Sequence, residues 1–202
     1  YMQRIGRDLT DSDLATHRSE WVDPVCVDYR EVQLCELPPN GQGFAALQMV
    51  SILNNVNLAQ WRRDDANVWH FLTEAKRLAF EDLARYYADP AFSEIPTSEL
   101  LSEDYGKKRF DLINPESATA SFEPGKFSFS SRGDTTYLTV ADSSGMMVSL
   151  IQSNYRGMGS GLVPDGLGFM LQDRGELFSL EPSHPNVYQP GKRPFHTIIP
   201  AF

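Results

Sequence analysis

A polar segment at residues 114–134 divides the chain into two parts that differ in the spacing of their apolar residues. This segment is rich in Ser, Pro and Gly, a composition typical of a loop or linker. Before it, the longest apolar pattern repeats with the period of a helix, and after it apolar and polar residues alternate as in strands. Helices followed by strands predict an α+β fold.

The clearest helical pattern covers residues 65–88, where an apolar stripe recurs until Asp89-Pro90 ends it. Residues 24–37 alternate as one extended segment, and Pro38-Pro39-Asn40-Gly41 separates this segment from the helix that follows. Shorter helices are predicted at residues 8–20, 43–53 and 97–112.

After the polar segment, the pattern changes to strands. Residues 135–141 and 146–155 are predicted to pair as a hairpin, because Asp142-Ser143-Ser144-Gly145 between them is a turn signal. Further strands are expected at 169–171 and 193–202.

The bulk composition limits the classes of function. The 202 residues carry a formal charge of −9, which argues against nucleic-acid binding because that needs a basic surface. No run of about 18 apolar residues is available for a transmembrane helix, so no membrane association is expected. The chain shows no signal peptide and does not begin with Met, which suggests a piece of a longer protein. The bacterial cytoplasm or periplasm is the expected compartment, and a homo-oligomer is possible.

The two cysteines and four histidines give no support for a metal centre. Cys26 and Cys35 do not form a CxxC pair, and the histidines are scattered along the chain. The spacing of the cysteines allows a disulfide, but we expect two free buried thiols. Neither a metal nor another cofactor is predicted.

Gly133 and Asp134 lead from the polar segment to Thr135, which opens the first strand of the predicted hairpin. An ordinary strand start is one reading of this pattern. The other is self-cleavage, in which the Thr135 hydroxyl attacks the carbonyl before it and water releases the upstream piece. The new amine, with an ordinary pKa of about 7.7–8.0, then serves as the base for its own hydroxyl.

Several motifs resemble the gamma-glutamyltransferase (gamma-glutamyltranspeptidase) family of N-terminal nucleophile hydrolases, and they occur in the right order over nearly the whole chain. They are Glu36-Leu37-Pro38-Pro39-Asn40-Gly41-Gln42-Gly43, the run from Thr135 to Asp142, Gly145, the run from Val148 to Tyr155, the glycines of 157–161 and Arg193-Pro194. The resemblance implies a partial αββα sandwich of the N-terminal nucleophile hydrolase type. It also implies that residues 1–134 end a large subunit and 135–202 begin a small one, together forming one incomplete domain.

The resemblance further implies a catalytic pair. Thr135 would be the nucleophile both for cutting the Asp134–Thr135 bond and for turnover. Ser153 stands where the family has a second Thr, whose hydroxyl bonds to the nucleophile. The alternative for Ser153 is a plain serine on the face of a sheet.

The chain departs from the family at the positions that bind substrate. Tyr137 stands in place of a His, and Tyr155 in place of an Asn. The family's Gln and Asp that hold an α-amino group are replaced by Arg174 and Leu177. The family's paired serines are replaced by His196 and Thr197. Tyr155, Arg174, His196 and Thr197 are the predicted substrate-binding residues, although each could be structural. Arg174 would repel an ammonium group and pair with a carboxylate.

The resulting expectation is a self-processing threonine enzyme that cleaves amides of gamma-glutamyl or related acyl groups, in an unprocessed form. A cephalosporin (glutaryl) acylase-like amidohydrolase is the alternative within enzymes, and an inactive homologue or fragment is the alternative outside them. The expected partners are the small acyl-amide substrate and the remaining segments of the same enzyme. By the resemblance, the oxyanion-hole glycines lie beyond Phe202 and a carboxylate-binding Arg lies before Tyr1, so this polypeptide alone is expected to be inactive.

Overall fold

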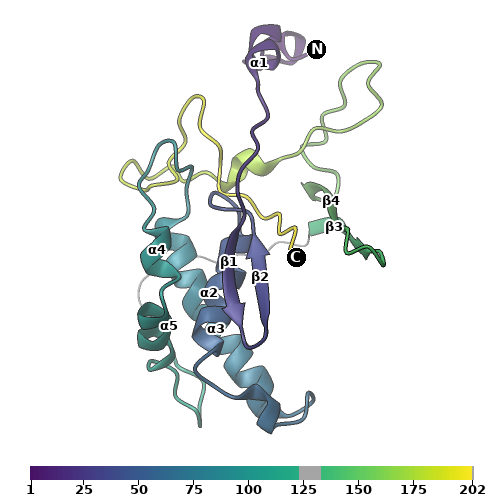
Figure 1. The fold of residues 1–202 in the computed structure, drawn as a ribbon. Coiled ribbons are helices and arrows are strands. Elements are labelled where there is room, and N and C mark those ends of the chain that lie inside the picture. Colours follow the sequence, from purple (N-terminus) through teal and green to yellow (C-terminus); the bar gives the residue numbers. More distant parts are fainter. Residues whose placement is uncertain (123–132, 202) are drawn as a thin grey trace.

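The computed structural model describes residues 1–122 and 133–201, and it confirms the predicted α+β class (Figure 1). The helices α2 to α5 lie together, and a first hairpin, β1–β2, packs on α2 (Figure 1). A second hairpin, β3–β4, lies apart from the first, and an N-terminal arm that carries α1 projects from the body (Figure 1). The two hairpins form separate two-stranded antiparallel sheets.

Helices α2 (Gly43–Leu53) and α3 (Ala66–Tyr86) form the centre of the helical part and agree with the predicted ranges within two residues. The Asp65 side chain caps α3 by accepting a hydrogen bond from Asn67 N at 2.8 Å. The apolar faces of the helices meet in two adjoining core clusters. The fully buried side chains of these clusters include Phe44, Leu47, Ile52, Ala75, Leu78 and Ala79.

The predicted single helix at 97–112 is wrong, because the chain forms two helices there, α4 (Thr97–Leu100) and α5 (Glu103–Phe110). The break is at Ser102, whose hydroxyl accepts a hydrogen bond from Tyr105 N at 3.2 Å and so begins a new helix. At the N-terminus, α1 (Asp11–Thr16) is shorter than predicted and begins with a capping box between Thr10 and Asp13. Three short 3₁₀ helices complete the helical elements of the described residues: η1 (Gln3–Ile5), η2 (Leu58–Gln60) and η3 (Arg174–Leu177).

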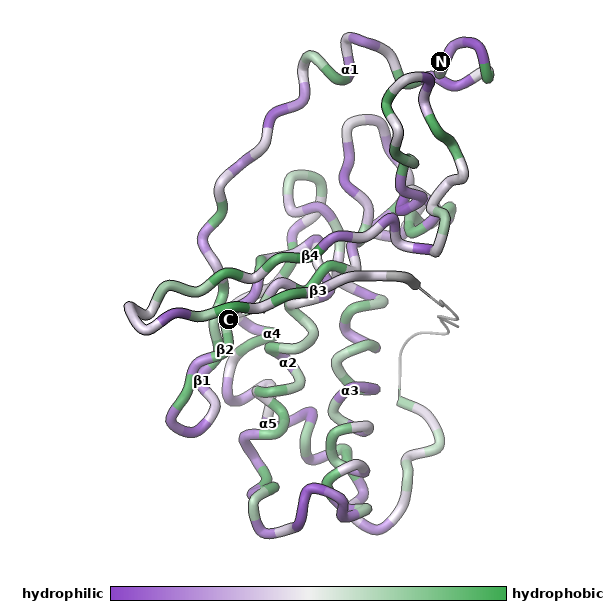
Figure 2. The backbone as a smooth tube through the Cα atoms, turned by 90° about the vertical axis from the view of Figure 1, so that its right-hand side faces the viewer, coloured by the Kyte–Doolittle hydropathy of each residue, from purple (hydrophilic) through white to green (hydrophobic). Residues whose placement is uncertain are grey.

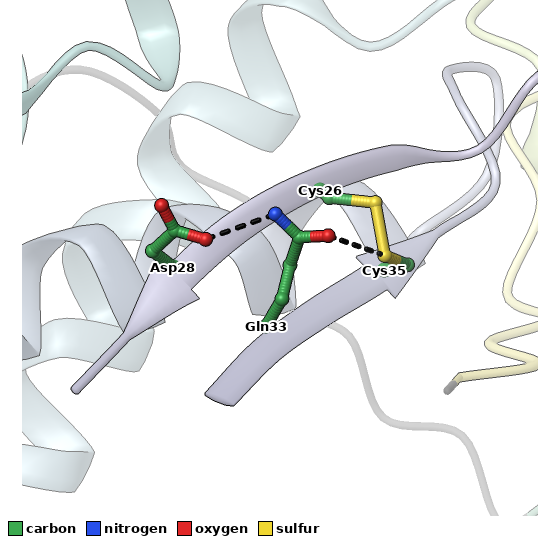
Figure 3. The surroundings of a disulfide bond; sticks show 4 residues. All are labelled: Cys26, Asp28, Gln33 and Cys35. Atoms are coloured by element: carbon green, nitrogen blue, oxygen red, sulfur yellow. Dashed lines mark hydrogen bonds between the residues drawn. A yellow bond between two sulfur atoms is a disulfide. The ribbon is translucent and has the colours of Figure 1, made fainter. Parts of the chain in front are cut away.

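The predicted extended segment 24–37 turns back on itself as β1 (Val25–Tyr29) and β2 (Val32–Glu36). The register places Cys26 opposite Cys35, and the two form a disulfide with a Cα–Cα distance of 4.1 Å (Figure 3). The expectation of free buried thiols is therefore wrong. A single strand would have separated the two cysteines by about 30 Å, and the unpredicted turn brings them together.

The predicted second hairpin is confirmed as β3 (Gly133–Ala141) and β4 (Met147–Arg156). The Asp142 carboxylate makes the turn by accepting hydrogen bonds from Ser144 N at 2.9 Å and Met146 N at 3.1 Å. Figure 2 shows hydrophobic positions along both strands. The register shifts between Gly133 and Thr135, so the ladder is irregular where the strand begins.

The strands predicted at 169–171 and 193–202 are wrong, because the described residues there form loops with isolated pairings. Phe195 is buried in the core cluster of the helical part, and His196 pairs with Gly41 beside the start of α2. The Arg193 guanidinium meets the buried Asp89 carboxylate at 2.8 Å. The end of the chain is thereby fixed to the helices. In the part of the chain that the structure describes, no helix has the length and hydropathy to cross a membrane.

Candidate functional site

Thr135 and Ser153 face each other across the β3–β4 ladder. The Thr135 hydroxyl donates a hydrogen bond of 2.8 Å to Ser153 Oγ, so the structure brings the two predicted catalytic side chains together. Thr135 is exposed and Ser153 is half-buried. The backbone of Asp134 belongs to β3, while its side chain lies outside the described part of the structure.

Ser153 is held by a second hydrogen bond, which its Oγ accepts from Tyr155 N at 2.9 Å. Tyr155 is buried and has φ of 77°, a left-handed conformation that is unusual for a residue with a Cβ. Such a conformation costs about 1–3 kcal/mol and persists only where surrounding contacts enforce it. The contact with Ser153 is one of these, and the ring of Tyr155 provides another.

The ring of Tyr155 lies beside the guanidinium of Arg174, whose Cζ is 5.2 Å from the ring centroid. Arg174 is only 3% exposed and donates from one guanidinium nitrogen to Thr197 Oγ1 at 2.5 Å. Among the described residues, no carboxylate lies within 4.0 Å of this guanidinium. Burial lowers the pKa of Arg174, because it disfavours the charged form.

His196 completes this group of predicted substrate-binding residues. Its Nδ1 accepts a hydrogen bond from Ile198 N at 3.2 Å, which places the proton of the neutral ring on Nε2. Burial, with a smaller contribution from the positive charge of Arg174, lowers the pKa of His196 to about 4. The imidazole is therefore uncharged at neutral pH.

A pocket of about 230 Å³ lies at the junction of the two parts of the chain. One wall comes from the loop before α2 and the other from the residues around η3 and the C-terminal segment. Its lining residues are Leu37, Pro38, Asn40, Gly41, Gln172, Arg174, Arg193, Pro194, His196 and Ile198. The loop is held against the C-terminal segment by hydrogen bonds from His196 N to Asn40 O at 2.9 Å and from Gln42 N to His196 O at 2.6 Å.

Tyr137 and Leu177 are the other two positions where the chain departs from the family pattern, and both make contacts within the fold. The hydroxyl of Tyr137 lies 3.0 Å from Ser149 Oγ and 3.3 Å from both backbone polar atoms of Ala201. Leu177 packs against the helical core. In the described residues, no group of three or more His, Cys, Asp or Glu side chains could hold a metal ion.

The sequence pattern of the gamma-glutamyltranspeptidase family matches residues 1–202, the whole of the chain. The chain belongs to this family. It is 37% identical over 201 residues to the glutathione hydrolase-like YwrD proenzyme of Bacillus subtilis (strain 168), and the match covers 100% of this chain and 37% of that protein. The oxamate amidohydrolase proenzyme of Klebsiella pneumoniae is 34% identical over 200 residues, with 99% of this chain and 37% of that protein covered. The chain thus spans little more than a third of the length of these relatives.

A solved structure of a family relative agrees with the fold. The crystal structure of cephalosporin acylase from Bacillus halodurans matches with a TM-score of 0.87 and 42% identity, and the match covers 100% of this chain and 35% of that one. The predicted partial fold of the N-terminal nucleophile hydrolase type is confirmed.

Only Arg174 and His196 of the pocket in this gamma-glutamyltranspeptidase-family chain were among the predicted site residues, and the unpredicted lining includes two side-chain amides, those of Asn40 and Gln172. Asn40 lies in the Pro-Pro motif, and its side-chain amide donates to Pro194 O at 2.5 Å. Gln172 accepts a hydrogen bond from Arg174 N through Oε1. The motif offered a signal for Asn40, whereas nothing in the local sequence distinguishes Gln172.

Proposed function

We propose that the protein containing this chain is a self-processing threonine amidohydrolase or acyltransferase that acts on gamma-glutamyl or related acyl amides. The observation that carries the proposal is the hydrogen bond from the Thr135 hydroxyl to Ser153, at the irregular start of β3. Membership of the gamma-glutamyltranspeptidase family supports it, as do relatives that are named proenzymes.

In the proposed self-cleavage, Thr135 Oγ1 attacks the carbonyl carbon of Asp134. The amide bond between them breaks, the hydroxyl proton ends on the freed amine, and an ester joins the two pieces. Water then hydrolyses the ester, which restores the hydroxyl and gives the upstream piece a terminal carboxyl group. The hydrogen bond to Ser153 fixes the direction of the Thr135 hydroxyl, because Ser153 is itself held by Tyr155 N.

In the proposed turnover, the new amine of Thr135 accepts the proton of its own hydroxyl while Oγ1 attacks the acyl carbon of a substrate amide. An α-amine has an ordinary pKa of about 7.7–8.0, so a useful fraction is neutral near pH 7. The proton passes to the leaving amine, and the acyl group remains on Oγ1 as an ester. Water or an amine acceptor then takes the acyl group in a second attack.

The proposed cut would leave residues 1–134 at the end of a large subunit and 135–202 at the start of a small one. Contacts across the cut support association of the two products. Phe195 lies in the core cluster of the helical part, and Arg193 donates to the buried Asp89 carboxylate from its backbone N and its guanidinium.

Mass spectrometry of the full-length protein tests this proposal. We expect a new N-terminus at Thr135 that disappears in Thr135→Ala and persists in Thr136→Ala, the matched control on the same strand. An intact wild-type chain that hydrolyses no acyl anilide would contradict the proposal and favour an inactive homologue.

A cephalosporin (glutaryl) acylase-like activity is a second candidate. It is favoured by Arg174, which would oppose the α-ammonium of a glutamyl group. The Klebsiella relative is named for oxamate, an amide whose acyl group carries a carboxylate and no ammonium group. The same chemical feature distinguishes a glutaryl group from a glutamyl group.

A further inference from the structure

The phenol of Tyr137 joins β3 to a part of the chain that lies 64 residues further along the sequence. Its hydroxyl donates a hydrogen bond to Ala201 O at 3.3 Å and accepts one from Ala201 N at the same distance. Ser149 Oγ, on the other strand of the hairpin, lies 3.0 Å from the same hydroxyl. A phenolic hydroxyl can donate one hydrogen bond and also accept, so these contacts are compatible with one another when Ser149 is the donor.

Tyr137 lies on the face of the hairpin that carries the proposed nucleophile. Side chains two residues apart on a strand point to the same face, so Tyr137 shares its face with Thr135, about 7 Å away along β3. The register places Ser153 opposite Thr135 on this face. Figures 1 and 2 both show the C-terminus beside β3. Ala201 therefore lies against the face that carries the Thr135–Ser153 pair.

The other end of the C-terminal segment, residues 195–201, is held without Tyr137. Its first three residues contact, in order, the helical core, the loop before α2 and the Arg174 guanidinium; they are Phe195, His196 and Thr197. Within the described residues, the hydrogen bonds of Ala201 are both made with Tyr137. The segment is thus fixed at its start by the body of the protein and at Ala201 by the Tyr137 hydroxyl.

Two series of contacts lead from this segment to the Thr135–Ser153 pair. One passes through Arg174 and the ring of Tyr155, where Cζ and the ring centroid are 5.2 Å apart, to the Tyr155 N–H that holds Ser153. The other passes through the Tyr137 hydroxyl to β3. Loss of this hydroxyl would leave the first series in place. It would release only the end of the segment that lies against the face of Thr135.

We infer that Tyr137 is a positioning residue for the proposed reaction, and that its hydroxyl fixes Ala201 beside Thr135 as a wall of the site. This inference rests on the proposed function, because it assigns a role in turnover by Thr135. The wall restricts the acyl group that Thr135 attacks, and a small displacement from the productive geometry is costly in rate. The predicted substrate-binding residues His196 and Thr197 keep their own contacts. Loss of the hydroxyl should therefore affect the chemical step more than substrate binding.

Steady-state kinetics of full-length Tyr137→Phe tests the inference, since this change keeps the ring and removes only the hydroxyl. The probes are gamma-glutamyl- and glutaryl-p-nitroanilide. Because self-cleavage can be incomplete, kcat is expressed per new N-terminus at Thr135, counted by mass spectrometry. We expect kcat for the cleaved anilide to fall by about 10-fold or more and KM to stay within about 3-fold. Ser149→Ala removes one hydrogen bond from the same hydroxyl but leaves both contacts with Ala201, so this matched control should keep both values.

Hydrogen exchange of the Ala201 amide separates failure of the inference from failure of the proposed function. In full-length Thr135→Ala protein, Tyr137→Phe should speed this exchange by about 3- to 10-fold, as expected for one hydrogen bond, while the His196 amide keeps its rate. An unchanged kcat, an equal loss of kcat in Ser149→Ala, or unchanged exchange at Ala201 would overturn the inference. If the wild type neither cuts its chain nor cleaves an anilide, the proposed function fails and the role of Tyr137 fails with it. Faster exchange would then still establish the contact between Tyr137 and Ala201.

Discussion

Glu36 should make the protein less stable at neutral pH than at mildly acidic pH. This residue ends β2, is 3% exposed, and has one carboxyl oxygen, Oε2, that is buried without a hydrogen-bond partner. Burial raises the pKa of Glu36 from an ordinary 4.5 to about 7, although the backbone N–H of Leu37 acts in the opposite direction. Glu36 also lies so close to Gly43 at the start of α2 that a Cβ there would clash with Oε2.

The sign and size of the effect follow from proton linkage. A folded-state pKa above the unfolded value means that the folded state binds more protons, so this contribution to stability is complete below pH 4.5 and is lost as pH rises to about 7. A pKa difference of about 2.5, at 1.36 kcal/mol for each unit, corresponds to a loss of about 3 kcal/mol. This figure is an upper bound, because the start of α2 would favour the carboxylate.

The assay is urea unfolding of Glu36→Gln at pH 4.5 and pH 8, in a full-length Thr135→Ala background that would block the proposed self-cleavage. The substitution should raise the free energy of unfolding at pH 8 relative to pH 4.5 by up to about 3 kcal/mol. The difference between the free energies of unfolding at the two pH values cancels any pH-independent free-energy cost of burying the amide. Glu31→Gln, at the exposed turn of the same hairpin, is the matched control and should leave the pH profile unchanged. A difference below about 0.5 kcal/mol for Glu36→Gln would refute the reasoning.

Three further predictions concern the proposed nucleophile, the contact across the proposed cut and the β1–β2 hairpin. Ser153→Ala removes the acceptor of the Thr135 hydroxyl and should slow appearance of the new N-terminus by about 10-fold or more, whereas Ser149→Ala should not, as followed by mass spectrometry. Asp89→Ala leaves Arg193 without its carboxylate and should lower the free energy of unfolding by about 1.5–3 kcal/mol in urea titrations. Reduction of the Cys26–Cys35 disulfide, which closes a loop with a sequence separation of 9, should cost about 2–3 kcal/mol, measured by unfolding with and without a reductant.

The two hairpins show what the local sequence can predict. The β3–β4 turn is made by the Asp142 side chain, a chemistry that is visible in the residues themselves. The β1–β2 turn contains Arg30 with φ of 57°, a conformation that Gly or Asn would have indicated and Arg does not. The residues therefore predicted the β3–β4 turn and carried no signal for the β1–β2 turn. The disulfide that depends on the β1–β2 turn was missed for the same reason.

Contacts between distant segments explain the other errors. The residues from 193 onward alternate as in a strand, but Phe195 is buried among the helices and His196 pairs with Gly41. Neither partner is close in sequence, so no local pattern could indicate it. The same is true of Arg174: the resemblance identified the position, while its contacts with Tyr155 and Thr197 come from segments that are distant in the sequence.

Tyr155 links the Thr135–Ser153 pair to Arg174 through two different parts of one residue. Its backbone N–H reaches Ser153 with φ at 77°, and its ring lies beside the guanidinium. A glycine would relieve the backbone strain but remove the ring, and an alanine would keep the strain and also lose the ring. Because neither replacement preserves both contacts, the strained tyrosine fits the proposed site, whose two ends it connects.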